Sequence, residues 1–347
     1  KFIMAYTTIK KPSAYFNTVT YTGNGNAGHS ITGVGFQPDW TWVKNRSDTY
    51  GHNLVNSVTN TLMFSNANAP EEAIGNTVTS FDSDGFTVGT SAGVNANGQN
   101  LVSWNWLGSN TTAANTDGSI NSTVSANTTS GFSIVSYTGN ATSGATIGHG
   151  LGVEPSMIII KNRSSAKDWA VYHKNVGNNK KLLLNTTDAE SSSSYFNSTS
   201  PTSTVFSVNN SDTTNDTNPQ IAYCFAEKTG YSKFGSYVGN GNADGTFVYL
   251  GFKPSFVLRK YATGGTAGGE GWEMLDGTRS PFNVADKRLR ADTNQTEGTG
   301  ANYYVDFLSN GFKMRNADNA TNNSGATYIY MAFAEQPLVG DNPATAR

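Results

Sequence analysis

The sequence YTGNG at residues 21–25 occurs three times in slightly varied form, returning as YTGNA at 137–141 and as YVGNG at 237–241. A proline follows each copy at nearly the same distance, and a lysine lies six residues beyond each proline. The prolines are Pro38, Pro155 and Pro254, and the lysines are Lys44, Lys161 and Lys260. Offsets that hold through three copies indicate a tandem array of modules of about 100 residues each.

Within each copy the hydrophobic pattern has a period of two. In FSIVSYTG (132–139), neighbouring side chains alternate between the two faces of a strand. The Asn and Gly residues of the repeated motif supply the positive φ angles that tight hairpins require. Short strands with turn signals about every ten residues are typical of β-sandwiches. The sequence therefore predicts an all-β fold of three tandem β-sandwich, jelly-roll-like modules.

The repeat boundaries divide the chain into six segments. We expect an N-terminal tail or attachment segment at 1–14, a first module at 15–110, an Asn-, Thr- and Ser-rich linker at 111–130, a second module at 131–230, a third module at 231–337 and a C-terminal tail at 338–347. The second and third modules follow each other with almost no linker, so we expect them to be packed rigidly together.

Composition excludes several classes of function. The net charge of −2 comes without a basic cluster, which argues against a nucleic-acid partner because phosphate binding needs concentrated Lys and Arg. No apolar run approaches the roughly 18 residues that a membrane-spanning helix needs, so we expect no membrane insertion. The single cysteine, Cys224, excludes an internal disulfide framework and a cysteine-based zinc site.

Two patterns raise the question of a metal site. The sequence DSDG at residues 82–85 resembles part of a calcium loop, but the further oxygen ligands of a complete loop are missing. A hairpin turn explains it better, because Ser309-Asn310-Gly311 lies between the same pair of phenylalanines in the third module. The four histidines show no repeated spacing to one another or to carboxylates. We therefore predict no metal and no cofactor.

The first two repeated lysines begin the sequence KNRS, and this basic pair at a strand end is the best candidate for a ligand contact. Two interpretations are open: a solvated strand end whose Asn forms a turn, or contact with an anionic or carbohydrate ligand or with a neighbouring subunit. Tyr261 replaces the Asn in the third module, which weakens the case for a shared ligand. The candidate ligand-binding residues are Lys44, Asn45, Arg46, Lys161, Asn162 and Arg163.

No residue pattern predicts an enzyme. Glu227 and Glu335 end corresponding strands, but no carboxylate pair recurs of the kind that glycosidases need. Four tryptophans alternate along two strands of the first module, which places each pair on one face of its sheet. We favour a core position for them over an exposed sugar-stacking surface; they are Trp40, Trp42, Trp104 and Trp106. We predict no catalytic residues.

Long phrases of the sequence resemble a repeat domain of virion proteins of marine tailed bacteriophages, including cyanophages. The phrases include AYTTIKKPSAYFNTVTYTGNG, GVGFQPDWTWVKNRS, FDSDGFTVG, IGHGLGVEPSMIIIKNRS and IAYCFAEKTGYSKFGSYVGNGNADG. The resemblance extends from about residue 4 to residue 337. It implies a tail-fibre protein or a similar appendage on the virion surface, outside the cell, and it supplies no catalytic residues.

The resemblance and the composition together predict a non-enzymatic virion protein that displays β-modules to a host-cell glycan or receptor. Other virion proteins would be its further partners, and it would act as a homotrimer or as a pseudo-threefold monomer. A purely structural decoration protein of the capsid or tail is the alternative, and a polysaccharide-degrading spike is less favoured. Loops that differ between the modules are the expected contact surface: 89–100, 141–149, 188–201, 209–219 and 261–272.

Overall fold

The computed structural model describes residues 6–266 and 270–337. Strands make up nearly all of its regular structure, and helix is limited to single turns. These are α1 (Ala92–Asn95), α2 (Asn319–Asn322) and the 3-10 turns η1 (Pro12–Ala14) and η2 (Ala301–Tyr303). The all-β prediction is therefore confirmed. No helix within the two described ranges is long and apolar enough to cross a membrane.

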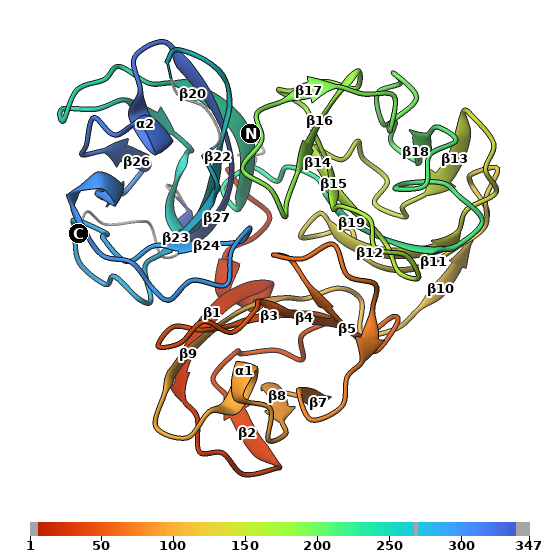
Figure 1. Ribbon diagram of the computed structural model, residues 1–347, viewed down its shortest axis with the longest axis horizontal. Helices are drawn as coiled ribbons and strands as arrows, with labels where there is room; N and C mark the ends of the chain where they lie inside the picture. The colour runs from red at the N-terminus through yellow and green to blue at the C-terminus, as the bar shows by residue number, and fades with distance from the viewer. Residues whose placement is uncertain (1–5, 267–269, 338–347) are drawn as a thin grey trace, which may run out of the picture.

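Unit 1, residues 16–107, pairs a large sheet with a small one (Figure 1). Its strands are β1 (Phe16–Thr22), β2 (His29–Thr32), β3 (Trp40–Asn45), β4 (Asn53–Asn56), β5 (Thr61–Phe64), β6 (Glu72–Ala73), β7 (Val78–Asp82), β8 (Gly85–Val88) and β9 (Asn100–Trp106). The large sheet has the order β1-β9-β3-β4-β5-β6 and the small sheet the order β2-β8-β7. An apolar layer that includes Val43, Phe86 and Leu101 is formed by residues of both sheets.

Unit 2, residues 113–226, repeats this arrangement with two more strands at one edge. Its strands are β10 (Ala113–Asn115), β11 (Ser122–Asn127), β12 (Phe132–Thr138), β13 (Ala145–Gly148), β14 (Met157–Asn162), β15 (Ala170–His173), β16 (Lys180–Leu183), β17 (Ser191–Ser192), β18 (Val205–Val208) and β19 (Pro219–Phe225). The large sheet has the order β10-β11-β12-β19-β14-β15-β16-β17, and β13 pairs with β18 in the small sheet.

Unit 3, residues 231–337, again combines a large and a small sheet. Its strands are β20 (Ser232–Val238), β21 (Phe247–Tyr249), β22 (Phe252–Gly264), β23 (Trp272–Asp276), β24 (Leu289–Arg290), β25 (Val305–Leu308), β26 (Gly311–Met314) and β27 (Ala326–Pro337). The orders are β20-β27-β22-β23-β24 and β21-β26-β25. The same order of five strands thus recurs in all three large sheets, as β1-β9-β3-β4-β5 and β12-β19-β14-β15-β16 in the other two.

Two segments expected outside the modules belong to the body of the molecule. Strands β10 and β11 lie within the expected linker, and Val124 of β11 packs in the apolar layer of unit 2. The Ser and Thr residues that indicated a linker here alternate with apolar ones, and Thr is a good strand former. Residues 6–14 of the expected N-terminal tail are also ordered, with Ile9 buried. The expected tail at 338–347 lies outside the described residues.

The repeated YTGNG motif closes each sandwich rather than forming an isolated hairpin turn. The hydroxyls of Tyr21, Tyr137 and Tyr237 each donate to a backbone carbonyl of the loop that precedes the last strand of the large sheet, at 2.7 Å in every unit. The residue two positions after each of these tyrosines is glycine for a steric reason. A Cβ at Gly23 would lie 2.2 Å from the carbonyl oxygen of Ala96.

A buried asparagine in the same loop completes this closure. Asn95 accepts from the backbone NH of Asn24 at 2.9 Å, and its amide donates to the carbonyl of Asn26 at 2.8 Å. Asn215 makes the corresponding bonds in unit 2, and Asn322 makes them in unit 3. The motif was therefore conserved between copies because its atoms fix the loop to the sheet.

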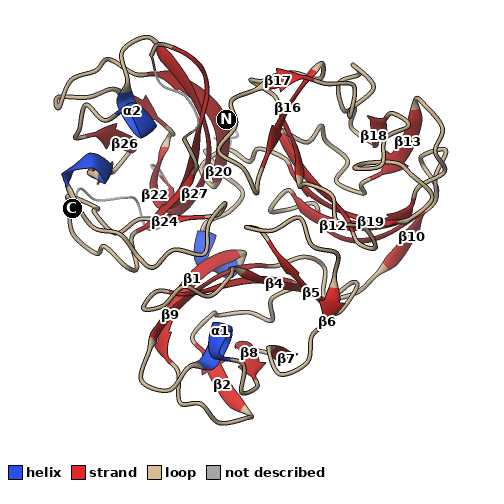
Figure 2. Cartoon of the chain, viewed as in Figure 1, coloured by secondary structure: helices blue, strands red, loops and turns tan. Residues whose placement is uncertain are grey.

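The three large sheets face a common centre, and the small sheets lie outside (Figure 2). One apolar cluster contains buried residues of all three units. Trp40 stacks on Tyr223 of unit 2 with ring centroids 4.2 Å apart, and Phe16 stacks on Phe333 of unit 3 at 4.7 Å. The core position predicted for the four tryptophans is confirmed, since all four are fully buried. The units share one core in addition to their separate apolar layers.

Candidate functional site

Three similar junctions, each built from hydrogen bonds between polar groups, join the units around the centre. At each junction a backbone NH of a glutamate donates to a carbonyl at the end of the strand that carries the repeated lysine. Glu71 of unit 1 bonds in this way to Arg163 of unit 2 at 2.8 Å, and Glu190 of unit 2 bonds to Ala262 of unit 3 at 2.9 Å. Glu297 of unit 3 bonds to Arg46 of unit 1 at 2.9 Å, which closes the ring.

Two of the junctions add a bidentate ion pair to this backbone bond. Arg163 donates to both carboxylate oxygens of Glu71 at 2.7 and 3.0 Å, and Arg46 donates to both of Glu297 at 2.8 Å. These side chains are largely buried, with exposed fractions between 12% and 23%. Burial opposes ionisation of Glu297, but the bond from Arg46 and the nearby Arg279 hold its pKa below the ordinary value. At the third junction Glu190 pairs with Lys180 instead.

The repeated lysines are buried inside the junctions, where backbone carbonyls surround each ammonium group. Lys161 donates to the carbonyls of Asn162 and Ser165 in its own unit and to Asn68 of unit 1 at 3.2 Å. Lys260 repeats this with Tyr261 and Glu270 and with Thr187 of unit 2 at 3.2 Å. Lys44 donates to two carbonyls of its own unit. Burial lowers the pKa of all three lysines to about 8.

In units 2 and 3 a tryptophan beside the lysine strand also reaches across its junction. The indole NH of Trp169 donates to the carbonyl of Phe64 in unit 1 at 3.0 Å, and that of Trp272 donates to Leu183 in unit 2 at 2.8 Å. His52 takes the corresponding place in unit 1 and accepts from Trp42 at 2.8 Å. Burial lowers the pKa of His52 well below its usual range, so the ring is neutral.

The candidate ligand-binding residues therefore lie in the junctions. Lys44, Lys161, Asn45 and Asn162 are fully buried, and the structure does not present them to a ligand. The two asparagines cap the turn after the strand, as the hydrogen bond from the Ser47 NH to Asn45 at 2.9 Å illustrates. The interpretation as a solvated strand end is wrong for the lysines. The other interpretation named an anionic or carbohydrate ligand or a neighbouring subunit, whereas Arg46, Lys161 and Arg163 contact a neighbouring unit of the same chain.

Most of the loops expected as contact surface are also used inside the chain. Loops 89–100 and 209–219 hold the buried asparagines that close the sandwiches of units 1 and 2. Loop 141–149 contributes strand β13, and loop 188–201 reaches unit 3 through Glu190. Loop 261–272 follows the lysine of unit 3, and its residues 267–269 lie outside the described part of the chain.

The DSDG segment forms a hairpin turn between β7 and β8, as predicted. The carboxylate of Asp84 accepts from the backbone NH groups of Gly33 and Gly35 at 3.1 and 2.7 Å, which lowers its pKa. Asp82 accepts from the hydroxyl of Thr87 at 2.7 Å. Within residues 6–266 and 270–337, no group of three or more His, Cys, Asp or Glu side chains is placed to hold a metal ion.

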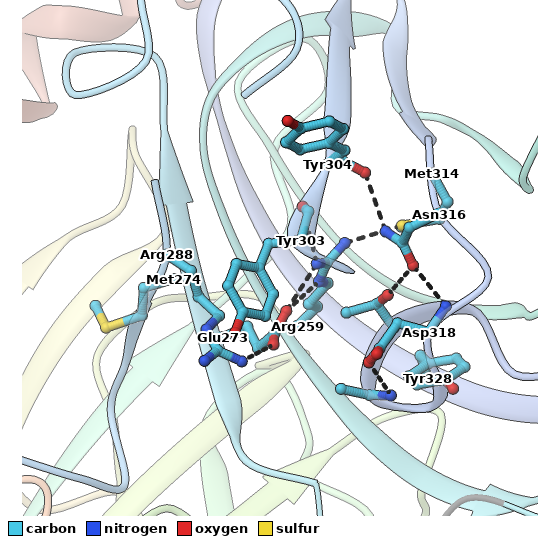
Figure 3. A network of polar contacts seen from close by, with 12 residues as sticks. Arg259, Glu273, Met274, Arg288, Tyr303, Tyr304, Met314, Asn316, Asp318 and Tyr328 are labelled. Carbon is cyan, nitrogen blue, oxygen red and sulfur yellow. Dashed lines mark hydrogen bonds and ion pairs between the residues drawn. The ribbon is translucent and has the colours of Figure 1, made fainter. Parts of the chain in front are cut away.

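A buried charge network in unit 3 was not expected from the sequence (Figure 3). Arg259 on β22 donates to Glu273 on the neighbouring β23 at 2.7 and 3.0 Å, and both side chains are fully buried. Arg288 donates to the other oxygen of Glu273 at 2.9 Å, and its guanidinium lies 3.6 Å from the centre of the Tyr303 ring. A buried pair of this kind is strongly destabilising to break, because each charge is then left without its partner.

The other two units have no such pair at the same place in the sheet. Val43 faces Asn53 in unit 1 and Ile160 faces Ala170 in unit 2, where Arg259 faces Glu273 in unit 3. The network ties η2 to the sandwich, since Arg259 also donates to the carbonyl of Tyr303. A departure of one copy from the other two was the only available sequence signal for it.

A second charged cluster reinforces the junction between units 3 and 1. Arg279 donates to Asp276 at 2.6 Å and to Glu297 at 3.1 Å, and Asp276 accepts from the indole NH of Trp104 at 3.1 Å. A cavity of about 440 Å³ lies near this junction, lined among others by Asn17 of unit 1 and by the Lys253–Glu335 ion pair of unit 3. The charged groups of this junction serve to hold two units together.

Comparison with known proteins gives one family. The family described as "Domain of unknown function (DUF7483)" matches residues 11–337. The chain belongs to this family. The matched region covers all three repeats, so the family treats them as one domain, in agreement with the shared core. No curated protein and no solved structure matches the chain.

Proposed function

We propose that this chain is a non-enzymatic structural protein of a phage virion, part of a tail fibre, spike or other surface appendage, which displays its units to a host-cell glycan or receptor. The observation that carries the proposal is the closed arrangement of three units around one aromatic core. The repeated charged residues point inward, into the junctions, where salt screens them little. Such a body suits a particle that must persist outside the cell.

The arrangement also supports action as a monomer with pseudo-threefold symmetry. The three junctions run from unit 1 to 2, from 2 to 3 and from 3 to 1, so the ring closes within one chain. A homotrimer of separate modules would need the same heterologous contact at each interface. Here the three units make these contacts within one chain. Because the units are not identical copies, each can differ from the others on its outer face.

The test is to locate the protein and then to measure its binding. Gold-labelled antibodies against the chain should mark purified virions at an appendage. Fluorescently labelled protein should bind saturably to cells that the particle infects, and stripping the surface polysaccharide should abolish this binding. Labelled virions without any cell binding would leave a decoration role, and unlabelled virions would contradict the proposal.

A further inference from the structure

Three exposed aromatic side chains lie together on unit 3, two of them on one edge strand and the third, Tyr6, from the N-terminal segment. Phe247 and Tyr249 project from β21, which forms the edge of the small outer sheet, and their exposed fractions are 42% and 50%. Between them, Val248 points inward and is buried. Tyr6 lies beside Tyr249 and is 36% exposed, with its hydroxyl donating to the carbonyl of Gly251 at 2.8 Å. We call Tyr6, Phe247 and Tyr249 the aromatic strip.

The other two units carry no aromatic residue at the matching positions. Val248 faces Phe312 across the small sheet of unit 3, just as Ile31 faces Phe86 in unit 1 and Ile147 faces Phe206 in unit 2. The residues that flank Ile31 are Ser30 and Thr32, both exposed, and those that flank Ile147 are Thr146 and Gly148. The inward positions are thus kept as core, whereas the outward positions became aromatic in unit 3 alone.

The rings of the strip are held in place before any ligand arrives. The Lys233 ammonium lies 5.3 Å from the centre of the Tyr249 ring and donates to the Tyr249 carbonyl at 3.0 Å. A Cβ at Gly311 would lie 3.2 Å from the Phe247 ring, so this ring rests directly against the backbone of β26. Rigid aromatic rings bind with a small loss of conformational entropy.

The charged groups around the strip are already engaged, Lys233 by the carbonyl and ring of Tyr249 and two other cations by carboxylates. Lys313, which faces Phe247 across the sheet, pairs with Asp244 at 3.0 Å, and Arg315 pairs with Asp306 at 3.1 Å. The strip therefore combines flat apolar rings with neutralised polar groups that can bond to hydroxyls. Sugar rings match this surface, because one face of a pyranose presents CH groups while its edge presents hydroxyls. The matching ligand is uncharged.

A protein partner fits this surface less well. Half-exposed rings offer roughly 200 Å² in total, whereas a stable protein interface buries about 800 Å² on each partner. Pairing with a strand of another protein is also opposed, because Lys233 already bonds the carbonyl of Tyr249 at the sheet edge. Lysines over edge strands are a common means of preventing such pairing.

We propose that the aromatic strip is a carbohydrate-binding site for a neutral polysaccharide. This rests on the function proposed above and names the unit, the residues and the class of ligand. A strip of this size binds one short stretch of polymer weakly, and several copies on one particle raise the overall affinity.

The experiment is affinity electrophoresis of the full chain in gels that contain a neutral glucan, mannan, galactan or xylan, or a sulfated polysaccharide for comparison, with and without added salt. The unmodified chain should be retarded by at least one of these polymers at both salt concentrations. The double variant Phe247→Ser, Tyr249→Thr gives unit 3 small hydroxyl side chains like those of unit 1, and its affinity for the polymer should fall by at least about tenfold. The control Ser30→Ala, Thr32→Ala should bind as the unmodified chain does.

Both variants should keep the midpoint of thermal unfolding, because the changed side chains are exposed. Undiminished binding of the double variant would overturn the proposal, and so would the absence of retardation by every neutral polymer. Retardation only by a sulfated polymer, abolished by salt, would overturn it as well. If the double variant still binds host cells, the strip is not the binding site, but the proposed function stands. If the chain binds a neutral polymer but is absent from virions, the strip is a carbohydrate site, but the proposed function is wrong.

Discussion

The inner, large sheets and the outer, small sheets of the three units differ in how closely their side chains match from one unit to the next. On the inner faces, large aromatic and apolar side chains occupy matching places and meet in one core, as Trp40 and Tyr223 do. On the small outer sheets, matching places hold Ser30 in unit 1 and Phe247 in unit 3. Side chains that recur in all three units therefore hold the molecule together. Side chains that differ in one unit mark a surface that is specific to that unit.

The three junctions show the same principle on a smaller scale. The lysine among carbonyls and the backbone bond to a glutamate recur at all of them, whereas the bidentate Arg–Glu pair occurs at two. At the junction between units 2 and 3, Ala262 stands where the other junctions have arginine. The units are joined mainly by their shared core and backbone, and the ion pairs add to this unequally.

The largest effect should come from the inner face. Trp40→Ala removes a fully buried ring that touches rings of unit 2, and we expect it to lower the free energy of unfolding by about 3–5 kcal/mol. Phe247→Ala on the outer face should change it by about 0.5 kcal/mol or less. Urea unfolding followed by circular dichroism measures both. Equal effects would contradict the distinction between the two faces.

The next effect tests the junction pairs. Arg163→Ala leaves the carboxylate of Glu71 largely buried without its partner, and it should cost about 2–3 kcal/mol of unfolding free energy. Lys167→Ala removes half of an exposed pair with Asp212 in the same unit, and its effect should be much smaller because solvent screens the pair. A double-mutant cycle of Arg163 with Glu71 isolates the pair itself. A coupling energy near zero would show that the bidentate pair holds nothing together.

The buried lysines predict an unusual alkaline dependence. Their pKa is about 8 in the folded chain against 10.5 for an ordinary lysine. Below pH 8 both states are protonated; between pH 8 and 10.5 the unfolded chain binds more protons, so stability rises with pH. We expect a gain on the order of 1 kcal/mol per lysine by about pH 9.5. Lys161→Met should remove about one third of the rise in urea titrations at several pH values, and a stability that falls from pH 8 to 9.5 would contradict this.

The smallest effect concerns the repeated turn. Ala141 has a φ of 53°, in the left-handed region, where the other copies have Gly25 and Gly241. Ala141→Gly should raise the free energy of unfolding by about 0.5 kcal/mol, because relief of strain exceeds the added flexibility of the unfolded chain. The reverse change, Gly241→Ala, should lower it by about 1 kcal/mol. Thermal unfolding measures both changes, and a loss of stability from Ala141→Gly or a gain from Gly241→Ala would refute the equivalence of the two turns.

The all-β fold and the buried tryptophans could be predicted, because a period of two and a motif repeated three times depend on local sequence alone. The roles of the repeated lysines could not. A lysine is normally solvated, and two of the three buried here bond to a carbonyl that another unit brings to them, as Asn68 does for Lys161 and Thr187 for Lys260. One signal did point to the junctions: Lys260 persists in the third copy although the rest of KNRS is lost. The Arg259–Glu273 pair likewise depends on a sheet register that only the fold reveals.

Differential scanning calorimetry of the full chain tests the central claim, that three units share one core, most directly. We expect a single endotherm in which the calorimetric and van't Hoff enthalpies agree, because no unit can unfold without exposing the rings of the other two. Trp40→Ala should shift that whole endotherm to lower temperature. Two or three separable transitions, with the substitution moving only one of them, would contradict the claim and make the units independent domains.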